Sequence, residues 1–182
     1  MPNDVLAQLA LDLPVGVIRP AVRAPEAVLS RRCSEVDPRD PATARLAADL
    51  VATMASSPGC VGLAANQIGV SERVFSMDVS NHPKTKTSHG LFVLVNPVVE
   101  QASRNEKARE GCLSVPDFTG DVKRATRVTI RGWVPGTGNE VVITTDAFEA
   151  RALQHEVDHL DGLLFLDRVA GAHAIHPRQT YL

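Results

Sequence analysis

Aromatic residues are scarce in this chain of 182 residues. Phe, Tyr and Trp together make up 4% of the sequence, with one Trp and one Tyr. A core must therefore be built from Val, Leu, Ile and Ala, and the 44% hydrophobic content is enough for one such core. An aliphatic core of this kind favours a β-containing fold with a few helices.

The sequence also has no strong charge of either sign and no long apolar run. Its formal net charge is -2, which gives no electrostatic reason to expect nucleic-acid binding. No window approaches the roughly 20 apolar residues of a membrane-spanning helix. Residues 1–20 have neither a basic segment nor a small-residue cleavage site, so no signal peptide is expected. These absences predict a soluble, cytoplasmic protein with a small or peptidic ligand and no membrane partner.

Cysteine is rare as well, with only Cys33, Cys60 and Cys112. Three thiols cannot all pair within one chain, and a domain of this size does not need disulfides. A reducing cytosol is the natural compartment.

Local signals predict two long helices. The first covers residues 41–57, where Asp40 is placed to cap the helix and Pro41 fits its first position. Leu46, Leu50 and Met54 recur there every four residues and predict an apolar stripe along the helix. The second covers residues 147–160. Asp146 and Glu149 have the spacing of a capping box there, and Gly162 follows as a stop. The side chains expected to anchor this second helix on a sheet are Phe148, Ala152 and Leu153.

Four β-rich runs lie between the helices, at residues 73–79, 91–99, 122–133 and 140–145. The polar stretch 80–90 predicts an exposed loop, in which His82 and His89 are expected to face solvent. The order helix, strands, helix predicts a single α+β domain over residues 1–182, with largely antiparallel sheets packed around the last helix. Residues 1–20 are expected to be an N-terminal extension and residues 173–182 an irregular tail.

The last helix carries the most informative motif, His155-Glu156-Val157-Asp158-His159, which has the HExxH spacing of metal-dependent hydrolases. Residues four apart lie on one helix face about one turn from each other, so the two imidazoles can share a cation. Glu156 is poorly placed as a third ligand, but it can reach a water molecule on the open side of a metal.

A catalytic site of this type needs a third protein ligand. Position 165, where an elongated HExxHxxGxxH motif needs a histidine, holds Phe165. The downstream carboxylates are few, and the downstream imidazoles lie in the aperiodic tail. All four are therefore weak candidates: Asp161, Asp167, His173 and His176. Cys112 stands out upstream, since its thiolate suits Zn²⁺ or Fe²⁺ and a glycine and a proline flank its segment.

Three segments in order, Gly62-Leu63-Ala64-Ala65-Asn66-Gln67, Glu110-Gly111-Cys112-Leu113-Ser114 and Gln154-His155-Glu156-Val157-Asp158-His159, closely resemble the signatures of the peptide deformylase family. These hydrolases remove the formyl group from nascent N-formylmethionyl peptides. The resemblance spans roughly half of the chain, from Gly59 to Gly162. It implies a metal held by Cys112, His155 and His159.

The resemblance also implies the roles of further residues. Glu156 falls on the family's catalytic glutamate, which activates the metal-bound water, and Gln67 and the backbone N–H of Leu113 fall on its oxyanion-stabilising groups. Substrate binding is expected at Gly62, Val61 and Gly111. The implied cofactor is one divalent ion, with Fe²⁺ expected as the native metal and Zn²⁺, Ni²⁺ or Co²⁺ also suited to these ligands.

The chain departs from the family pattern in two places. Cys60 stands where a glycine is common, and only about twenty residues with few basic groups follow Gly162. The implied partners are the formylated peptide and a transient contact with a bacterial ribosome, although the basic C-terminal helix that many members use there is not evident.

Two other functions compete with deformylation. A HExxH zinc metalloprotease is disfavoured by the weak downstream ligands and by the Gln67 and Cys112 signatures. A non-enzymatic structural metal site would need a fourth ligand, for which Cys33 or Cys60 is the candidate.

Overall fold

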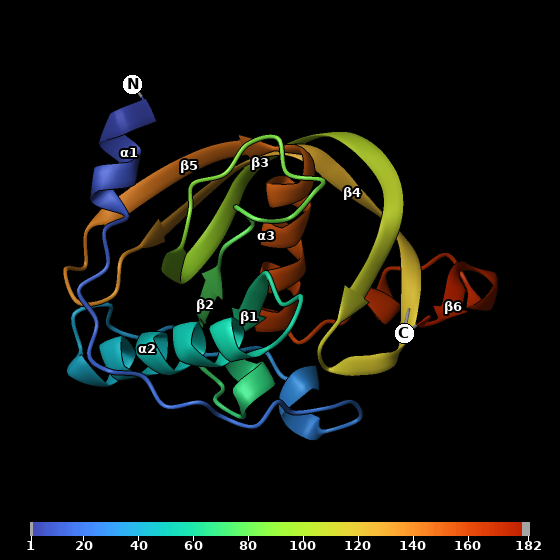
Figure 1. Ribbon diagram of the computed structural model, residues 1–182, viewed down its shortest axis with the longest axis horizontal. Helices are drawn as coiled ribbons and strands as arrows, with labels where there is room; N and C mark the ends of the chain where they lie inside the picture. The colour runs from blue at the N-terminus through green and yellow to red at the C-terminus, as the bar shows by residue number, and fades with distance from the viewer. Residues whose placement is uncertain (1, 180–182) are drawn as a thin grey trace.

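One antiparallel sheet wraps around a central helix in the computed structural model, which describes residues 2–179 (Figure 1). The strand order is β1-β2-β3-β4-β5, and β6 pairs with β4 on the side. This arrangement confirms the predicted α+β class and the central position of the HExxH helix. The strands are β1 (Gly62–Ala64), β2 (Val74–Met77), β3 (Phe92–Cys112), β4 (Val115–Trp133), β5 (Glu140–Asp146) and β6 (Ile175–Pro177).

The α-helices within residues 2–179 are α1 (Pro2–Gln8), α2 (Pro41–Ser56) and α3 (Ala147–Leu160), and short 3₁₀ turns connect several elements: η1 (Ala27–Ser30), η2 (Ala65–Ile68), η3 (Phe165–Asp167) and η4 (Ala172–Ala174). No helix in this part of the chain is long and apolar enough to cross a membrane.

Helix α2 forms where its local signals predict it. The Asp40 carboxylate accepts a hydrogen bond from the Ala42 amide at 2.8 Å, and Pro41 occupies the first turn. The predicted apolar stripe is buried against β1 and β2, with Leu50 fully enclosed. This helix therefore supports the short strands that lead into the site.

Helix α3 begins and ends as predicted, but the predicted capping box at its start is wrong. Asp146 makes no side-chain cap and instead accepts a hydrogen bond from the Thr87 hydroxyl at 2.8 Å. The fully buried Glu149 accepts from Thr145 Oγ1 at 2.6 Å and from the His89 amide at 2.8 Å. The distant loop that carries Thr87 and His89 thus takes the acceptors that a local box would use.

The same loop corrects the prediction that its histidines face solvent. The His82 ring stacks on Phe148 with the centroids 3.8 Å apart. The His89 side chain is only 15% exposed, and its Nδ1 lies 2.8 Å from Glu149 Oε2. Residues 80–90 are therefore anchored on the first turn of α3.

The hairpin of β3 and β4 is the largest feature of the sheet and extends well beyond the predicted runs at 91–99 and 122–133. Residues 101–107 of β3 are exposed and, apart from Ala102, polar, so burial gives them no alternating pattern in the sequence. The pairing of β3 with β4 nevertheless runs through them and on to Gly111. The hairpin curves over α3 (Figure 1). Its tip is the turn Leu113-Ser114, which follows the pair Cys112↔Val115.

The segment predicted as an irregular tail is ordered over part of its length. Residues 175–177 form β6, and His176 faces Thr119 in the antiparallel pairing with β4. This part of the prediction is wrong because hydrogen bonds to a neighbouring strand order a segment without any periodicity of its own. Residues 180–182 lie outside the described part.

The main core fills the space between α3 and the inner face of the sheet. Its largest fully buried members include Phe75, Phe92 and Leu153, so the few aromatic residues are used at the centre. Leu153 and Ala152 are buried as predicted, and Phe148 packs at the edge of this cluster. Helix α3 is thereby held with its histidine-bearing end near β1 and the hairpin tip.

Candidate metal centre

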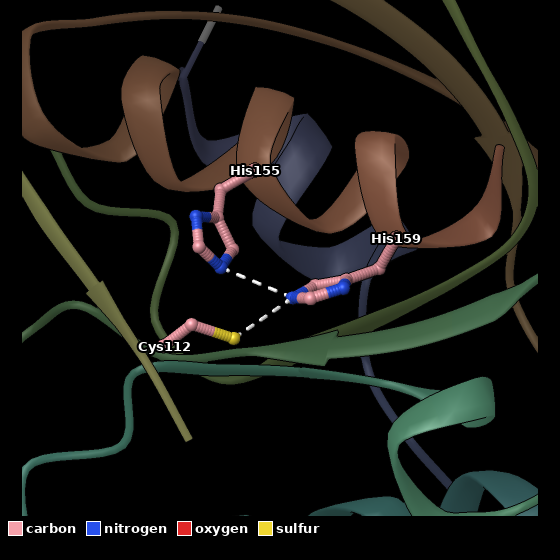
Figure 2. A group of neighbouring side chains, drawn as sticks. All are labelled: Cys112, His155 and His159. Carbon is pink, nitrogen blue, oxygen red and sulfur yellow. Dashed lines mark hydrogen bonds between the residues drawn. The ribbon is translucent and has the colours of Figure 1, made fainter. Parts of the chain in front are cut away.

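Three side chains converge between α3 and the hairpin tip. His155 and His159 project from one face of α3, and Cys112 reaches toward them from the end of β3 (Figure 2). The two Nε2 atoms lie 3.1 Å apart, and His159 Nε2 lies 3.3 Å from Cys112 Sγ. One ligand atom from each residue falls within 4.8 Å of the other two. The three predicted ligands are thus brought together.

The donor set fits a divalent cation. Ligand atoms around a tetrahedral Zn²⁺ lie about 3.3 to 3.6 Å apart, because the bonds are about 2.0 to 2.3 Å long. The measured separations of 3.1 and 3.3 Å are close to that range. Burial would raise the pKa of the Cys112 thiol, but the His159 and His155 imidazoles hold it well below its usual value of 9.0. The thiolate that a metal requires is therefore favoured.

Glu110 fixes the orientation of the first imidazole. Its Oε2 lies 3.1 Å from His155 Nδ1, which directs Nε2 of the same ring toward Cys112 and His159. Burial would raise the pKa of Glu110, but hydrogen bonds from His155 and Arg124 lower it to about 2. Glu110 is therefore an anion that holds the candidate metal ligand His155 in place.

A buried ionic network supports Glu110 from behind. Arg124 pairs with Glu110 and donates from Nη1 to Asp158 Oδ2 at 2.8 Å, and Arg151 donates to Glu110 Oε1 at 3.2 Å. Arg168 Nη2 pairs with the other oxygen of the same carboxylate, Asp158 Oδ1, at 2.7 Å. Sequence reasoning assigned no role to these residues. Glu110 and Asp158 stand inside quoted motifs, but nothing local marks the strand residue Arg124.

Glu156 lies beside the three ligands and is not one of them. Its side chain is buried, and Oε2 has no hydrogen-bond partner among the described residues. Burial raises the pKa of Glu156 above its ordinary 4.5, against the opposing effect of His155 and His159. A buried carboxylate with a free oxygen next to a metal site is equipped to accept and return a proton.

Gln67 is also placed at the site. Its Oε1 accepts from the Ala64 amide at 3.0 Å, which turns the Nε2 group toward Ser114 Oγ at 3.2 Å and Cys112 Sγ at 3.5 Å. Asn66, for which no role was predicted, donates to the carbonyl of His159 at 2.5 Å and ties η2 to the end of α3. The Gly62–Gln67 signature therefore contacts both other signatures.

These residues surround a cleft of about 370 Å³, a size suited to a small ligand. Its walls include every predicted catalytic and substrate-binding residue: Val61, Gly62, Gln67, Gly111, Leu113 and Glu156. Gly62 is the first residue of β1 and Val61 precedes it, whereas Gly111 and Leu113 come from the hairpin tip. The cleft therefore runs between the edge strand β1 and the hairpin.

The other cysteines and histidines do not complete the centre. Cys60 lines the cleft, but its thiol donates to the carbonyl of Gly62 at 3.2 Å. Cys33 is buried in the main core, and His176 contacts Asp121. No fourth donor joins the three ligands within the described residues, which argues against the predicted alternative of a closed structural site.

Comparison with known proteins shows which family has this arrangement. A family model described as polypeptide deformylase matches residues 18–174. The chain belongs to this family. A peptide deformylase from Desulforudis audaxviator (strain MP104C) is 45% identical over 149 residues, which cover 81% of this chain and 90% of that protein. One from Rhizobium meliloti (strain 1021) is 37% identical over 154 residues, or 84% of this chain and 86% of that protein.

Solved deformylase structures share the fold. Peptide deformylase from Thermotoga maritima has a TM-score of 0.76 and 31% identity, and the match covers 85% of this chain and 99% of that one. A class I type b peptide deformylase from Acinetobacter baumannii, solved with Met-Ala-Ser bound, has a TM-score of 0.76 and 33% identity, with 84% and 99% covered. The chain is accordingly a deformylase, a hydrolase that acts on nascent peptides, and its group of Cys112, His155 and His159 could hold a metal ion.

Proposed function

We propose that this deformylase removes the formyl group from N-formylmethionyl peptides, with one divalent ion held by Cys112, His155 and His159 and with Glu156 as the proton carrier. The observation that carries the proposal is the buried Glu156 carboxylate in the cleft, whose Oε2 has no hydrogen-bond partner within residues 2–179. When bound, the ion supplies Lewis acidity and lowers the pKa of water toward neutrality from about 15.7. Fe²⁺ is the proposed native metal, and the thiolate and imidazoles also suit Zn²⁺, Ni²⁺ or Co²⁺.

Glu156 moves the proton that the reaction requires. It accepts a proton as water attacks the formyl carbon, and it donates that proton to the amine as the C–N bond breaks. The products are formate and a peptide with a free N-terminus. Burial raises the pKa of Glu156, which makes its carboxylate a stronger proton acceptor than an exposed one.

Gln67 and Leu113 stabilise the negative charge that develops on the formyl oxygen. The Gln67 amide is held by Ala64 and directed at the cleft, so its N–H group is oriented before the substrate arrives. The backbone N–H of Leu113 belongs to the hairpin tip on the same cleft. Loss of a single donor of this type costs about 10² to 10³ in kcat in other hydrolases.

The substrate peptide adds to the edge of the sheet. β1 is the terminal strand of the order, so its outer edge is available to an extended peptide. Gly62 and Gly111 lie on the two sides of the cleft as the proposed contacts for the peptide main chain, and Val61 contributes apolar wall for the methionine side chain. Since formylated chains emerge from bacterial ribosomes, we expect the enzyme to act in the cytoplasm through transient ribosome contact.

The test compares formyl-Met-Ala-Ser with an unformylated peptide, using wild type and Glu156→Ala loaded with Fe²⁺ or Co²⁺ under anaerobic conditions. Wild type should release formate from the first peptide only. Glu156→Ala should keep one metal per chain and its thermal unfolding transition but lose turnover. Cleavage of the internal amide alone would instead support a HExxH protease.

A further inference from the structure

The mouth of the cleft is basic. The two carboxylates on its walls, Glu110 and Glu156, are buried at the inner end and belong to the metal centre. Toward solvent the charged side chains are Lys84, Arg109 and Arg178, all exposed. A ligand that enters from solvent therefore meets positive charge first.

Arg178 lies over the predicted path of the peptide. It follows β6, and its amide donates to the carbonyl of Asp117 at 2.8 Å, which fixes its backbone beside the hairpin tip. Its Nη2 donates to the carbonyl of Cys112 at 3.3 Å. A Cβ built on Gly111 would stand 2.5 Å from the same Nη2, so the guanidinium covers Gly111 directly.

A second cavity of about 430 Å³ continues from this point. Arg109, Thr119 and Arg178 line both cavities, and His176 and Pro177 of β6 line the second. Arg178 therefore stands where the cleft passes into an outer chamber. A peptide that continues from the cleft into this second cavity would pass this guanidinium.

The cations at the mouth differ in how they are paired. Arg109 is neutralised by Asp121 at 2.7 Å, and Asp121 also contacts His176 at 3.0 Å. No carboxylate of residues 2–179 forms a salt bridge with Lys84 or with Arg178. These two cations are thus available to an anionic group on a ligand.

We propose that Arg178 binds an acidic side chain within the two residues that follow the formylmethionine, and so gives this deformylase a preference for acidic nascent N-termini. The inference rests on the proposed function and adds a substrate class to it. Arg178 acts through ground-state contact with the substrate and takes no part in the chemistry. Exposed ion pairs are weak individually, so one such pair predicts roughly a two- to five-fold gain in kcat/KM for an acidic over a neutral residue.

The test uses C-terminally amidated peptides with Glu, Gln or Lys at the third position, formyl-Met-Ala-Glu, formyl-Met-Ala-Gln and formyl-Met-Ala-Lys, and the matching set with the second position varied. Wild-type enzyme should favour Glu over Gln and Gln over Lys, mainly through KM, in one set at least. The preference should shrink as salt is raised from 0.05 to 0.5 M, because exposed pairs are screened.

Variants separate a charge contact from a structural role. Arg178→Gln should bring the Glu to Gln ratio of kcat/KM to about one, Arg178→Lys should restore most of it, and Arg178→Glu should favour the Lys peptide. Arg127→Gln removes an exposed arginine that does not line either cavity, and it should leave the ratio as in wild type.

The outcomes distinguish the two proposals. If wild type releases no formate from any of the peptides, the proposed function fails. If wild type deformylates all of them without an acidic preference, or if Arg178→Gln lowers kcat/KM for every peptide by the same factor, the function stands and the role of Arg178 is overturned.

Discussion

Gly62 lies directly against the carboxylate of Glu156: a Cβ on residue 62 would stand 2.5 Å from Oε1 and 2.9 Å from Cδ. The glycine of the first signature therefore makes room for the Glu156 carboxylate. This contact links the edge strand to the catalytic helix across the cleft.

We expect Gly62→Ala to displace the Glu156 carboxylate and lower kcat/KM for formyl-Met-Ala-Ser by about 10², since a shift of about 1 Å at a reacting group has that effect. Metal content and urea unfolding should stay close to wild type. Gly171→Ala, whose Cβ would meet only the His173 ring at 3.2 Å, is the matched control. Full activity in Gly62→Ala would show that the carboxylate position is not critical.

Glu110→Gln should weaken metal binding. Loss of the anion that faces His155 Nδ1 removes the partner that orients this ligand, and such partners contribute about 10- to 100-fold in affinity. Competition with a chromogenic chelator measures the change, with Zn²⁺ or Co²⁺ as the probe. Glu140→Gln changes an exposed carboxylate of β5 and should bind metal like wild type. Equal affinity in both variants would contradict the orienting role.

Asn66→Ala should destabilise the fold by about 2 kcal/mol. The substitution deletes a buried hydrogen bond to the carbonyl of His159 and leaves a small cavity. Urea titration followed by circular dichroism measures the free energy of unfolding. Asn105→Ala, at an exposed position of β3, should change it by less than about 0.5 kcal/mol. A similar loss in both variants would mean that the anchor contributes nothing specific.

Cys60 should react slowly with iodoacetamide at neutral pH. Burial and the nearby Glu156 raise its pKa to about 12, so at pH 8 roughly one thiol in 10⁴ is ionised. The thiolate fraction rises as the pH approaches that pKa, and the alkylation rate should increase about ten-fold per pH unit from 8 to 10. Peptide mapping by mass spectrometry follows Cys60 separately from Cys112. Labelling at pH 8 as fast as that of glutathione would refute the raised pKa.

The sequence predicts those parts of the molecule whose signals are local. Asp40, Pro41 and a four-residue apolar repeat define α2, and the HExxH spacing places two ligands on α3. Cys112 is also predicted, because few other residues could serve as the third ligand. The roles proposed for Gln67, Leu113 and Glu156 rest on the family resemblance, and their positions on one cleft are consistent with it.

The features that were missed depend on distant partners. Glu149 has the spacing of a capping residue, but its carboxylate accepts a hydrogen bond from the His89 amide of a distant loop instead. Residues 101–107 of β3 are exposed on both faces and have no period to detect. Arg124 is one charged residue in a strand, and only the fold brings Glu110 and Asp158 to it.

The hairpin of β3 and β4 has a consequence for the chain lengths that the enzyme tolerates. Side chains alternate between the two faces of a strand, so one residue inserted in the arm before Cys112 would turn every following side chain to the opposite face. The register shift between Gly111 and Cys112 shows that the strand pairing near the tip already contains one irregularity. A single insertion at the exposed arm could therefore remove the thiol from the metal centre without altering any residue of the site. Two inserted residues would keep the Cys112 side chain on its original face. Activity should therefore depend on whether this arm changes by an even or an odd number of residues, as well as on the cysteine itself.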